Sequence, residues 1–250
     1  IARPEPDSFC SAILGRKILG MRRNAKYLIF DFDDASKMVV HLRMTGNLLY
    51  MDGSSKINIK SDENGLPRHT RVIFTLNDGS FLCFCDQRKF GRLWLYSSDE
   101  DYKDCGIDRL GPEPLTADFS KEYLCKCLAK TQRQIKTVLL DQSIVSGIGN
   151  IYSDEILFEA GILPQTRACD ISKSRALSLH DAINNVISNG IKANQSSIEA
   201  YMLGARAQYT DLEKMDVYQK SGRKCKVCGT KIEKLTIGGR SSCFCPSCQR

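Results

Sequence analysis

Two Cys-x-x-Cys pairs near the end of the chain constrain its fold more than any other feature. They are Cys225–Cys228 and Cys245–Cys248, with residues 229–244 between them. Each pair can form a tight turn, and four thiolates at this spacing can converge tetrahedrally on one zinc ion. Residues 231–237 can form a strand that Gly238-Gly239 turns back into a second one. The sequence therefore predicts a hairpin built around one structural zinc ion, and the alternatives are two coincidental pairs or a redox pair.

The other cysteines do not extend this pattern. Cys243 precedes the second pair and falls outside the paired spacing, so we do not assign it as a ligand. A chain of 250 residues can bury a core without disulfide support. Free cysteine packs as a small hydrophobic residue, so reduced and buried thiols are expected at the remaining positions. These are Cys10, Cys83, Cys85, Cys105, Cys125, Cys127 and Cys169.

The charge is concentrated around the same cysteines. The chain has 36 Lys and Arg against 29 Asp and Glu, a net charge of +7. Residues 217–250 hold eight Lys and Arg and one acid, Glu233, so 8 − 1 = +7 arises there and the remainder is neutral. Zinc with four thiolates would lower this to about +5. An anionic partner is expected to bind the C-terminal region. No apolar run is long enough for a transmembrane helix, so no membrane association is expected.

Hydrophobic periodicity divides the rest of the chain. Alternating apolar residues and an Asn-Asp-Gly-Ser turn at 77–80 predict a β-sandwich or barrel. Its strands are expected at 26–32, 38–44, 72–76, 81–85 and 92–96, with a long loop at 51–68. After a polar linker at 97–118 the period becomes helical. Helices are expected at 120–129, 134–141, 151–160 and 173–189, with a shorter one near 198–203.

The turn at 145–152 combines two glycines with a predicted helix start. Asn150 is expected to be the N-cap, with Asp154 and Glu155 early in the helix and Gly161 just past its end. Free backbone amides at such a start can bind phosphate. The alternative is a tight turn between two helices.

Six stretches together resemble the formamidopyrimidine-DNA glycosylase family, the Fpg/Nei-type enzymes of base-excision repair. They occur in order along nearly the whole chain. They are 22–28 (RRNAKYL), 41–46 (HLRMTG), 86–91 (DQRKFG), 110–115 (LGPEPL), 147–152 (GIGNIY), and Val217-Tyr218 leading into the four-cysteine finger with Gly238-Gly239-Arg240.

The resemblance implies an α+β multidomain protein. It places an N-terminal β-sandwich without its first helix at 1–110, a helix–two-turn–helix domain at 111–215 and the zinc finger at 216–250. It also implies an enzyme that flips an oxidised purine, such as formamidopyrimidine or 8-oxoguanine, out of damaged double-stranded DNA and removes it. An AP lyase activity then nicks the strand by β- and δ-elimination. A monomeric, cytoplasmic protein of bacterial type is expected.

The resemblance also assigns residues. Lys26 matches the lysine that assists β-elimination, and Arg240 matches an arginine on the phosphates at the lesion that is implicated in δ-elimination. A second group is expected to contact DNA. Met44, Arg88 and Phe90 match the side chains that fill the space left by the flipped base, His69 matches a DNA-contacting histidine, and Lys136 and Asn150 match phosphate contacts. His41 and His180 are expected to be structural.

The sequence departs from the family pattern in two places. Family members begin Pro-Glu, and the proline amine is the nucleophile, whereas this chain begins at Ile1 and its internal Pro4 nitrogen is an amide. We therefore expect a chain lacking the family's start, one that binds DNA and zinc with little glycosylase activity. Residues 202–211 contain only Gly204 where the family's base-covering loop has several glycines. The alternatives are a non-catalytic damaged-DNA-binding paralogue, a Nei-like enzyme for oxidised pyrimidines, and a protein-interaction module.

Overall fold

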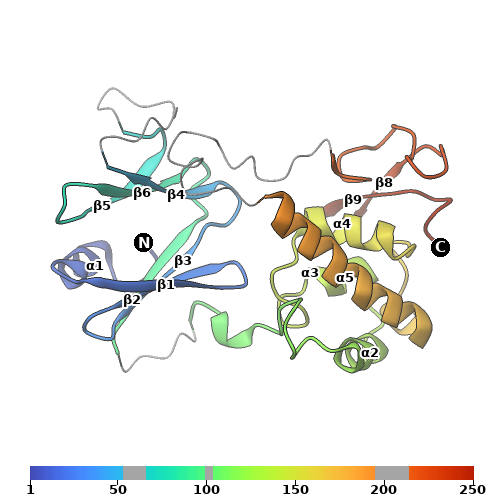
Figure 1. Cartoon of the computed structure of the whole chain (residues 1–250), viewed down its shortest axis with the longest axis horizontal. Helices are drawn as coiled ribbons and strands as arrows, with labels where there is room; N and C mark the ends of the chain where they lie inside the picture. The colour runs from blue at the N-terminus through green and yellow to red at the C-terminus, as the bar shows by residue number, and fades with distance from the viewer. Residues whose placement is uncertain (53–65, 99–103, 195–213) are drawn as a thin grey trace. The chain divides into compact units, whose positions relative to one another are not determined.

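The computed structural model describes residues 1–52, 66–98, 104–194 and 214–250. The chain divides into two compact units (Figure 1). Unit 1 contains Ile1–Asp108, and unit 2 contains Arg109–Gln195 together with Gln208–Arg250. The zinc-finger hairpin therefore belongs to the same compact unit as the helices.

Unit 1 is built from two antiparallel sheets. The first has the order β1-β2-β3-β7 and the second the order β4-β6-β5. Their apolar faces meet in one core that also takes Phe9 from a short N-terminal helix. The elements are α1 (Pro6–Ile13), β1 (Ile18–Asn24), β2 (Tyr27–Phe32), β3 (Lys37–His41), β4 (Gly46–Met51), β5 (Thr70–Thr75), β6 (Phe81–Asp86) and β7 (Arg92–Tyr96). The predicted sandwich is confirmed.

The sequence missed three elements of unit 1, namely α1, β1 and β4. Strand β1 is exposed along nearly its whole length, so its sequence shows no alternation of buried and exposed residues. The strand predicted at 38–44 ends at His41, because Arg43 adopts a positive φ of 55°. Met44 consequently lies in the turn before β4 and not within a strand.

The described part of unit 2 before the finger is helical. Its α-helices are α2 (Lys121–Ala129), α3 (Ile135–Leu140), α4 (Asn150–Glu159) and α5 (Lys173–Ala193), with a 3-10 turn at Ala168–Asp170. Another 3-10 turn, Ile107–Arg109, lies at the boundary between the two units. Side chains of Ser120 and Ser172 cap α2 and α5. These four helices lie where the sequence period placed them, and the short helix expected near 198–203 lies outside the described residues. Among the described helices, none is long and apolar enough to cross a membrane.

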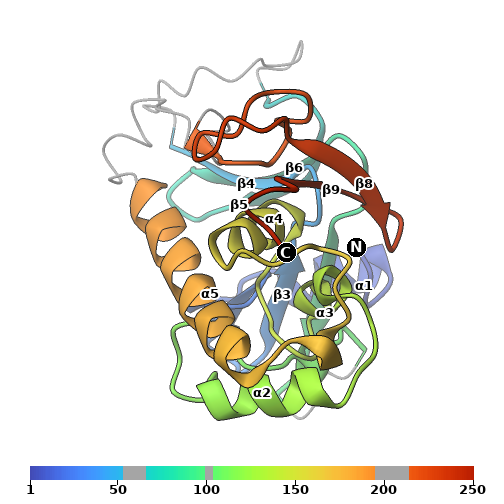
Figure 2. The same ribbon diagram turned by 90° about the vertical axis from the view of Figure 1, so that its right-hand side faces the viewer.

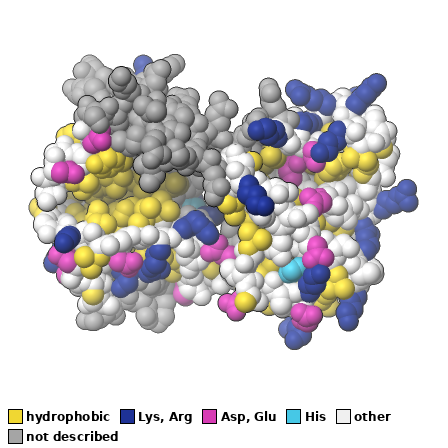
Figure 3. Space-filling view, viewed as in Figure 1, with side chains coloured by type: hydrophobic (Ala, Val, Ile, Leu, Met, Phe, Trp, Pro, Cys, Tyr) yellow, Lys and Arg dark blue, Asp and Glu magenta, His cyan; other side chains and the backbone are white. Residues whose placement is uncertain are grey.

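The finger is a two-stranded hairpin, β8 (Glu233–Ile237) and β9 (Arg240–Phe244), that packs against α4 (Figure 2). A small apolar cluster joins Phe158 of α4 to Val217, Ile232 and the finger cysteines. Lys and Arg side chains gather on the part of unit 2 that carries this hairpin (Figure 3). Hydrophobic side chains gather on the face of unit 1 seen in the same view. On the face seen in this view, the side chains that gather on the two units thus differ in kind.

Candidate functional site

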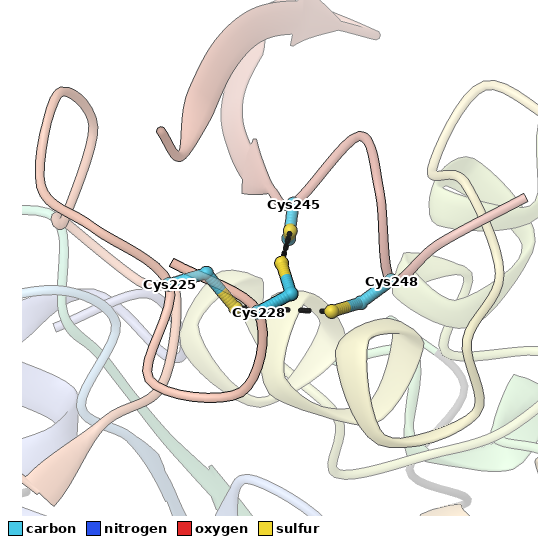
Figure 4. A group of neighbouring side chains, drawn as sticks. All are labelled: Cys225, Cys228, Cys245 and Cys248. Carbon is cyan, nitrogen blue, oxygen red and sulfur yellow. Dashed lines mark hydrogen bonds between the residues drawn. The ribbon is translucent and has the colours of Figure 1, made fainter. Parts of the chain in front are cut away.

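The four predicted ligand cysteines converge in the finger. Their sulfur atoms all lie within 4.8 Å of one another. The Sγ atoms of Cys225 and Cys248 are 3.8 Å apart, and those of Cys228 and Cys245 are 3.4 Å apart (Figure 4). Zinc–sulfur bonds of about 2.3 Å in a tetrahedron require sulfur separations of this order. The cluster can hold one zinc ion, and four protein ligands leave no open position, so the ion would be structural.

Backbone turns bring each cysteine pair to the metal site. The Cys225 N–H donates to the Thr230 carbonyl, and Gly229, with a φ of 74°, donates back to the Cys225 carbonyl. Cys243 is not part of the cluster, as the spacing predicted. Its side chain is buried in β9. The expectation that the scattered cysteines are buried holds for Cys83, Cys85 and Cys105. It is wrong for Cys10 and Cys169, which are exposed, and Cys125 and Cys127 are intermediate.

Arg240 begins β9 and is exposed at the tip of the hairpin. It pairs with Ile237 across the turn formed by Gly238 and Gly239, whose φ angles are 54° and 74°. Positive φ at both central residues is typical of the two-residue turn that matches the twist of a hairpin. A methyl group on Gly238 would approach Thr137 of α3 to 3.2 Å. The turn therefore lies against α3 and presents Arg240 at a defined place.

The turn before α4 is held by the side chain of Gln142. Its Nε2 donates to the carbonyls of Leu140 and Ile148, and its Oε1 accepts the N–H of Gly147, which has a φ of 90°. The prediction that Asn150 caps the helix is wrong, because Gly149 is the N-cap. The Asn150 side chain instead donates from Nδ2 to the Ser241 carbonyl of β9 at 3.1 Å.

Lys136 is fully buried, with 0% of its side chain exposed. Its Nζ donates to Asp154 Oδ1 at 2.5 Å and to the Asn150 carbonyl at 3.2 Å. Burial lowers the pKa of Lys136 and raises that of Asp154, and the attraction between them opposes both shifts. A phosphate could reach this ammonium only if the lysine left Asp154.

Asp154 and Glu155 bind the finger and do not act as helix-dipole residues at the start of α4. Asp154 accepts the Ser242 hydroxyl at 2.6 Å and the Cys243 N–H at 3.1 Å. Glu155 accepts the N–H groups of three consecutive residues at 2.6–3.0 Å, namely Asp216, Val217 and Tyr218. Burial raises the pKa of Glu155, and these hydrogen bonds oppose the shift.

Met44, Arg88 and Phe90 lie together in unit 1, as the sequence suggested. They come from the turn before β4 and the segment after β6. Arg88 Nη1 lies 3.1 Å from Met44 Sδ, and its guanidinium carbon lies 4.9 Å from the centre of the Phe90 ring. Met44 and Phe90 are 71% and 48% exposed, respectively. Two large apolar side chains and a cation thus project from unit 1 as one exposed group.

A buried carboxylate that the sequence reading did not single out fixes these two segments. Asp86 is 1% exposed and accepts the Thr45 hydroxyl at 2.5 Å, the Gly91 N–H at 2.7 Å and the Arg88 N–H at 3.2 Å. Burial alone would raise the pKa of Asp86, but these hydrogen bonds outweigh it and hold the pKa below its ordinary value. The sequence signal that could have identified Asp86 is its position at the end of a strand of buried apolar residues.

Lys26 and His69 occupy exposed turns of unit 1. Lys26 lies between β1 and β2, next to Ala25, which has a φ of 49°. His69 precedes β5 and has a φ of 66°. His41 is buried and meets the Tyr27 ring edge-on at 4.6 Å. Burial, followed by the charges of Arg43 and Lys26, lowers the pKa of His41 to about 4, so it is neutral at pH 7.

His180 has the packing of a structural residue. Its Nε2 lies 2.9 Å from the Phe119 carbonyl, and its ring stacks on that of Phe119. The loop at 202–211, which bears on base preference, lies outside the described residues.

Three family models match the chain. Residues 1–93 match the formamidopyrimidine-DNA glycosylase N-terminal domain, residues 110–202 its H2TH domain, and residues 222–250 the zinc finger found in FPG and IleRS. The match of the last model to the cysteine cluster confirms the predicted zinc site. Together the three models extend over most of the chain.

Curated relatives and solved structures agree with these models. A formamidopyrimidine-DNA glycosylase of Desulforamulus reducens is 42% identical, with 100% of this chain and 87% of that protein covered. One of Bacillus licheniformis is 38% identical, with 100% and 88% covered. The structure of Lactococcus lactis Fpg in complex with abasic-site DNA superimposes with a TM-score of 0.83 at 33% identity, covering 98% of this chain and 86% of that one. This chain belongs to the formamidopyrimidine-DNA glycosylase family.

Proposed function

We propose that this protein binds damaged double-stranded DNA, removes oxidised purines, and nicks the strand by β- and δ-elimination. Formamidopyrimidine and 8-oxoguanine are the expected bases. Family membership supports the glycosylase reaction, and similar structures are described as Lactococcus lactis Fpg with abasic-site DNA or Fapy-dG DNA. The basic surface around the finger supports an anionic partner.

The observation that carries the proposal is the exposed group of Met44, Arg88 and Phe90. Exposed apolar side chains that cluster, as Met44 and Phe90 do around Arg88, are typical of surfaces that contact a partner, whereas a single exposed one needs no explanation. A ring and a thioether can wedge into a base step, and a guanidinium can hydrogen-bond an unpaired base. Because Asp86 fixes both segments, the three side chains are arranged before DNA arrives. Such a group fits a duplex from which one base has been removed.

The remaining assignments follow from position. Arg240 and Asn150 would contact phosphates, Lys26 would assist β-elimination, and His69 would contact the DNA. Arg240 would also promote δ-elimination. The zinc ion, held by four cysteines, would support Arg240 and take no part in the chemistry. Lys136 is buried and pairs with Asp154.

Binding to a duplex with a tetrahydrofuran abasic-site analogue tests the proposal, measured by fluorescence anisotropy beside an undamaged duplex. The damaged duplex should bind about tenfold more tightly or better, and affinity for both should fall with salt as phosphate contacts release counterions. Met44→Ala and Phe90→Ala should each weaken binding to the damaged duplex by about tenfold, because each base-step contact contributes about 1–3 kcal/mol. Melting temperatures should not change.

Leu14→Ala is the matched control. Leu14 is an apolar residue of unit 1 that is 76% exposed, outside the loops of the proposed site, so its loss should leave both affinities unchanged. Equal affinity for the two duplexes, or salt-independent binding, would contradict the proposal. Comparing 8-oxoguanine with an oxidised pyrimidine in the same assay separates the purine enzyme from a Nei-like one.

A further inference from the structure

A buried ion pair connects three elements of unit 2. Lys136 of α3 and Asp154 of α4 are 0% and 1% exposed, and they are 2.5 Å apart. Asp154 also accepts the Ser242 hydroxyl and the Cys243 N–H of β9. Ser242 is itself fully buried. One carboxylate therefore binds a cation from one helix and two donors from the finger hairpin.

This arrangement makes direct DNA contact by Lys136 unfavourable. Its ammonium has an anionic partner and a carbonyl partner, both within 3.2 Å. Moving it to a phosphate would leave Asp154 as a buried charge without its cation, which is strongly unfavourable. The lysine is thus placed to act on neighbouring residues.

The hairpin residues that bind Asp154 lie close in sequence to Arg240, which is expected to contact phosphate. Side chains two apart on a strand point to the same face, so Arg240 leaves β9 on the face from which Ser242 reaches Asp154. Between them, the Ser241 carbonyl accepts the Asn150 side chain at 3.1 Å. Asn150 is also held through its own carbonyl by Lys136. Fixing Asp154 and Lys136 therefore fixes both Asn150 and Arg240.

We propose that Asp154 and Lys136 are positioning residues that hold Asn150 at the start of α4 and Arg240 of the finger in a fixed arrangement relative to each other. This inference rests on the proposed function, because it concerns how that function's phosphate contacts are arranged. A buried ion pair suits the task because removing either partner leaves an uncompensated buried charge, so both groups must stay in place. The arrangement requires α3, α4 and β9 to pack together, because each of them contributes one of the bonded residues.

The test is a double-mutant cycle on binding of the tetrahydrofuran duplex. Arg240→Ala should weaken binding about tenfold, as expected for loss of one charge-assisted hydrogen bond. Ser242→Ala, which leaves the ion pair intact, should weaken it about threefold through misplacement of Arg240. The double variant Ser242→Ala/Arg240→Ala should bind no more weakly than Arg240→Ala alone, because Ser242 acts through Arg240.

Ser247→Ala is the matched control within the finger. The Ser247 hydroxyl bonds to that of Thr230 and so links the two cysteine turns without contacting Asp154, so its loss should leave DNA affinity unchanged. Zinc content and melting temperature are measured for every variant. Asp154→Asn, which keeps the shape and removes the charge, should reproduce the Ser242→Ala loss and its dependence on Arg240.

The outcomes separate the two proposals. If the wild-type protein does not prefer the damaged duplex, or Arg240→Ala binds normally, the proposed function fails and the inference fails with it. Suppose instead that the wild-type protein prefers the damaged duplex and Arg240→Ala weakens binding. If Ser242→Ala then has no effect, or if its effect persists undiminished in the Arg240→Ala background, only the positioning role is overturned.

Discussion

Both units hold their candidate functional side chains on a buried aspartate, but the two aspartates are satisfied differently. Asp86 of unit 1 takes a hydroxyl and backbone N–H groups, and it fixes the exposed Arg88 and Met44 segments. Asp154 of unit 2 takes a hydroxyl, one backbone N–H and the ammonium of Lys136. Each is 1% exposed, so burial alone does not distinguish them.

The pKa shifts show what the difference means. The pKa of Asp86 is lowered, because local hydrogen bonds outweigh its burial. The pKa of Asp154 is raised, because burial among three elements outweighs even a neighbouring cation. A carboxylate at the end of a strand can be stabilised by the amides of its own turn. One enclosed between helix and hairpin depends on a distant lysine, and this dependence can be broken by mutation.

The largest effect is expected from removing the zinc ion. Structural zinc contributes on the order of 10 kcal/mol to a small finger, so Cys245→Ser or chelation should unfold β8 and β9. Asp154 would then lose its finger donors, whereas Asp86 would be untouched. Hydrogen exchange should show fast exchange in residues 217–250 and unchanged protection in unit 1. Retained protection of the hairpin after the metal is lost would contradict this expectation.

The next largest effect is expected at Lys136. Lys136→Met should cost about 3–5 kcal/mol of unfolding free energy, because it leaves a buried carboxylate without its cation. Adding Asp154→Asn should recover part of that loss, since no charge then remains unbalanced. Urea denaturation of the full chain measures the free energy of unfolding of both variants. A double variant less stable than Lys136→Met would show that charge balance is not what this site requires.

A smaller, pH-dependent effect is expected at Asp86. Asp86→Asn should cost about 1–3 kcal/mol at pH 7, because an amide cannot replace all the charge-assisted acceptance. The folded pKa lies below the unfolded value of about 3.9, so the stabilisation is fully present above that value and is lost as the pH falls through the folded pKa. Urea unfolding of both proteins from pH 7 to pH 3 should show the gap closing. A gap that is constant with pH would refute the assignment to the carboxylate.

The smallest effect is expected at an exposed pair in unit 2. Lys121 and Asp181 are 2.8 Å apart, but their side chains are 41% and 60% exposed. Lys121→Ala should cost less than about 1 kcal/mol, because water already solvates both charges. The loss of unfolding free energy in this variant is the reference for Lys136→Met. Similar losses at the two sites would contradict the expectation that the buried lysine contributes more than the exposed one.

The features that sequence could predict are those encoded by local spacing. The four metal cysteines follow from two short repeats, and the long helices follow from their period. Gly161 ends α4 with a φ of 64°, as its place after the last periodic residue indicated. Each of these depends on residues only a few positions apart, so a single pattern contains the whole signal.

The features that sequence could not predict depend on partners far along the chain. Asn150 was expected to cap α4, yet its side chain bonds to Ser241, 91 residues away. Lysine is usually found on the solvent-exposed face of a helix, and Lys136 is buried because Asp154 and β9 pack against it. Nothing near Asp154 indicates that its donors come from Ser242 and Cys243. Pairings of this kind become visible only once the hairpin is placed on the helix.

The two adjacent acids of α4 also bear on how separable the finger is. Asp154 takes donors from the hairpin, and Glu155 takes the amides of Asp216, Val217 and Tyr218, where the finger segment begins. If the four cysteines were transferred to another protein, they could still bind zinc, but the finger would lack its hydrogen bonds to Asp154 and Glu155. A helical domain expressed without the finger would leave Asp154 with Lys136 but without its finger donors, and Glu155 without its three amide donors. The finger is therefore expected to fold as a separate module only when α4 is included with it.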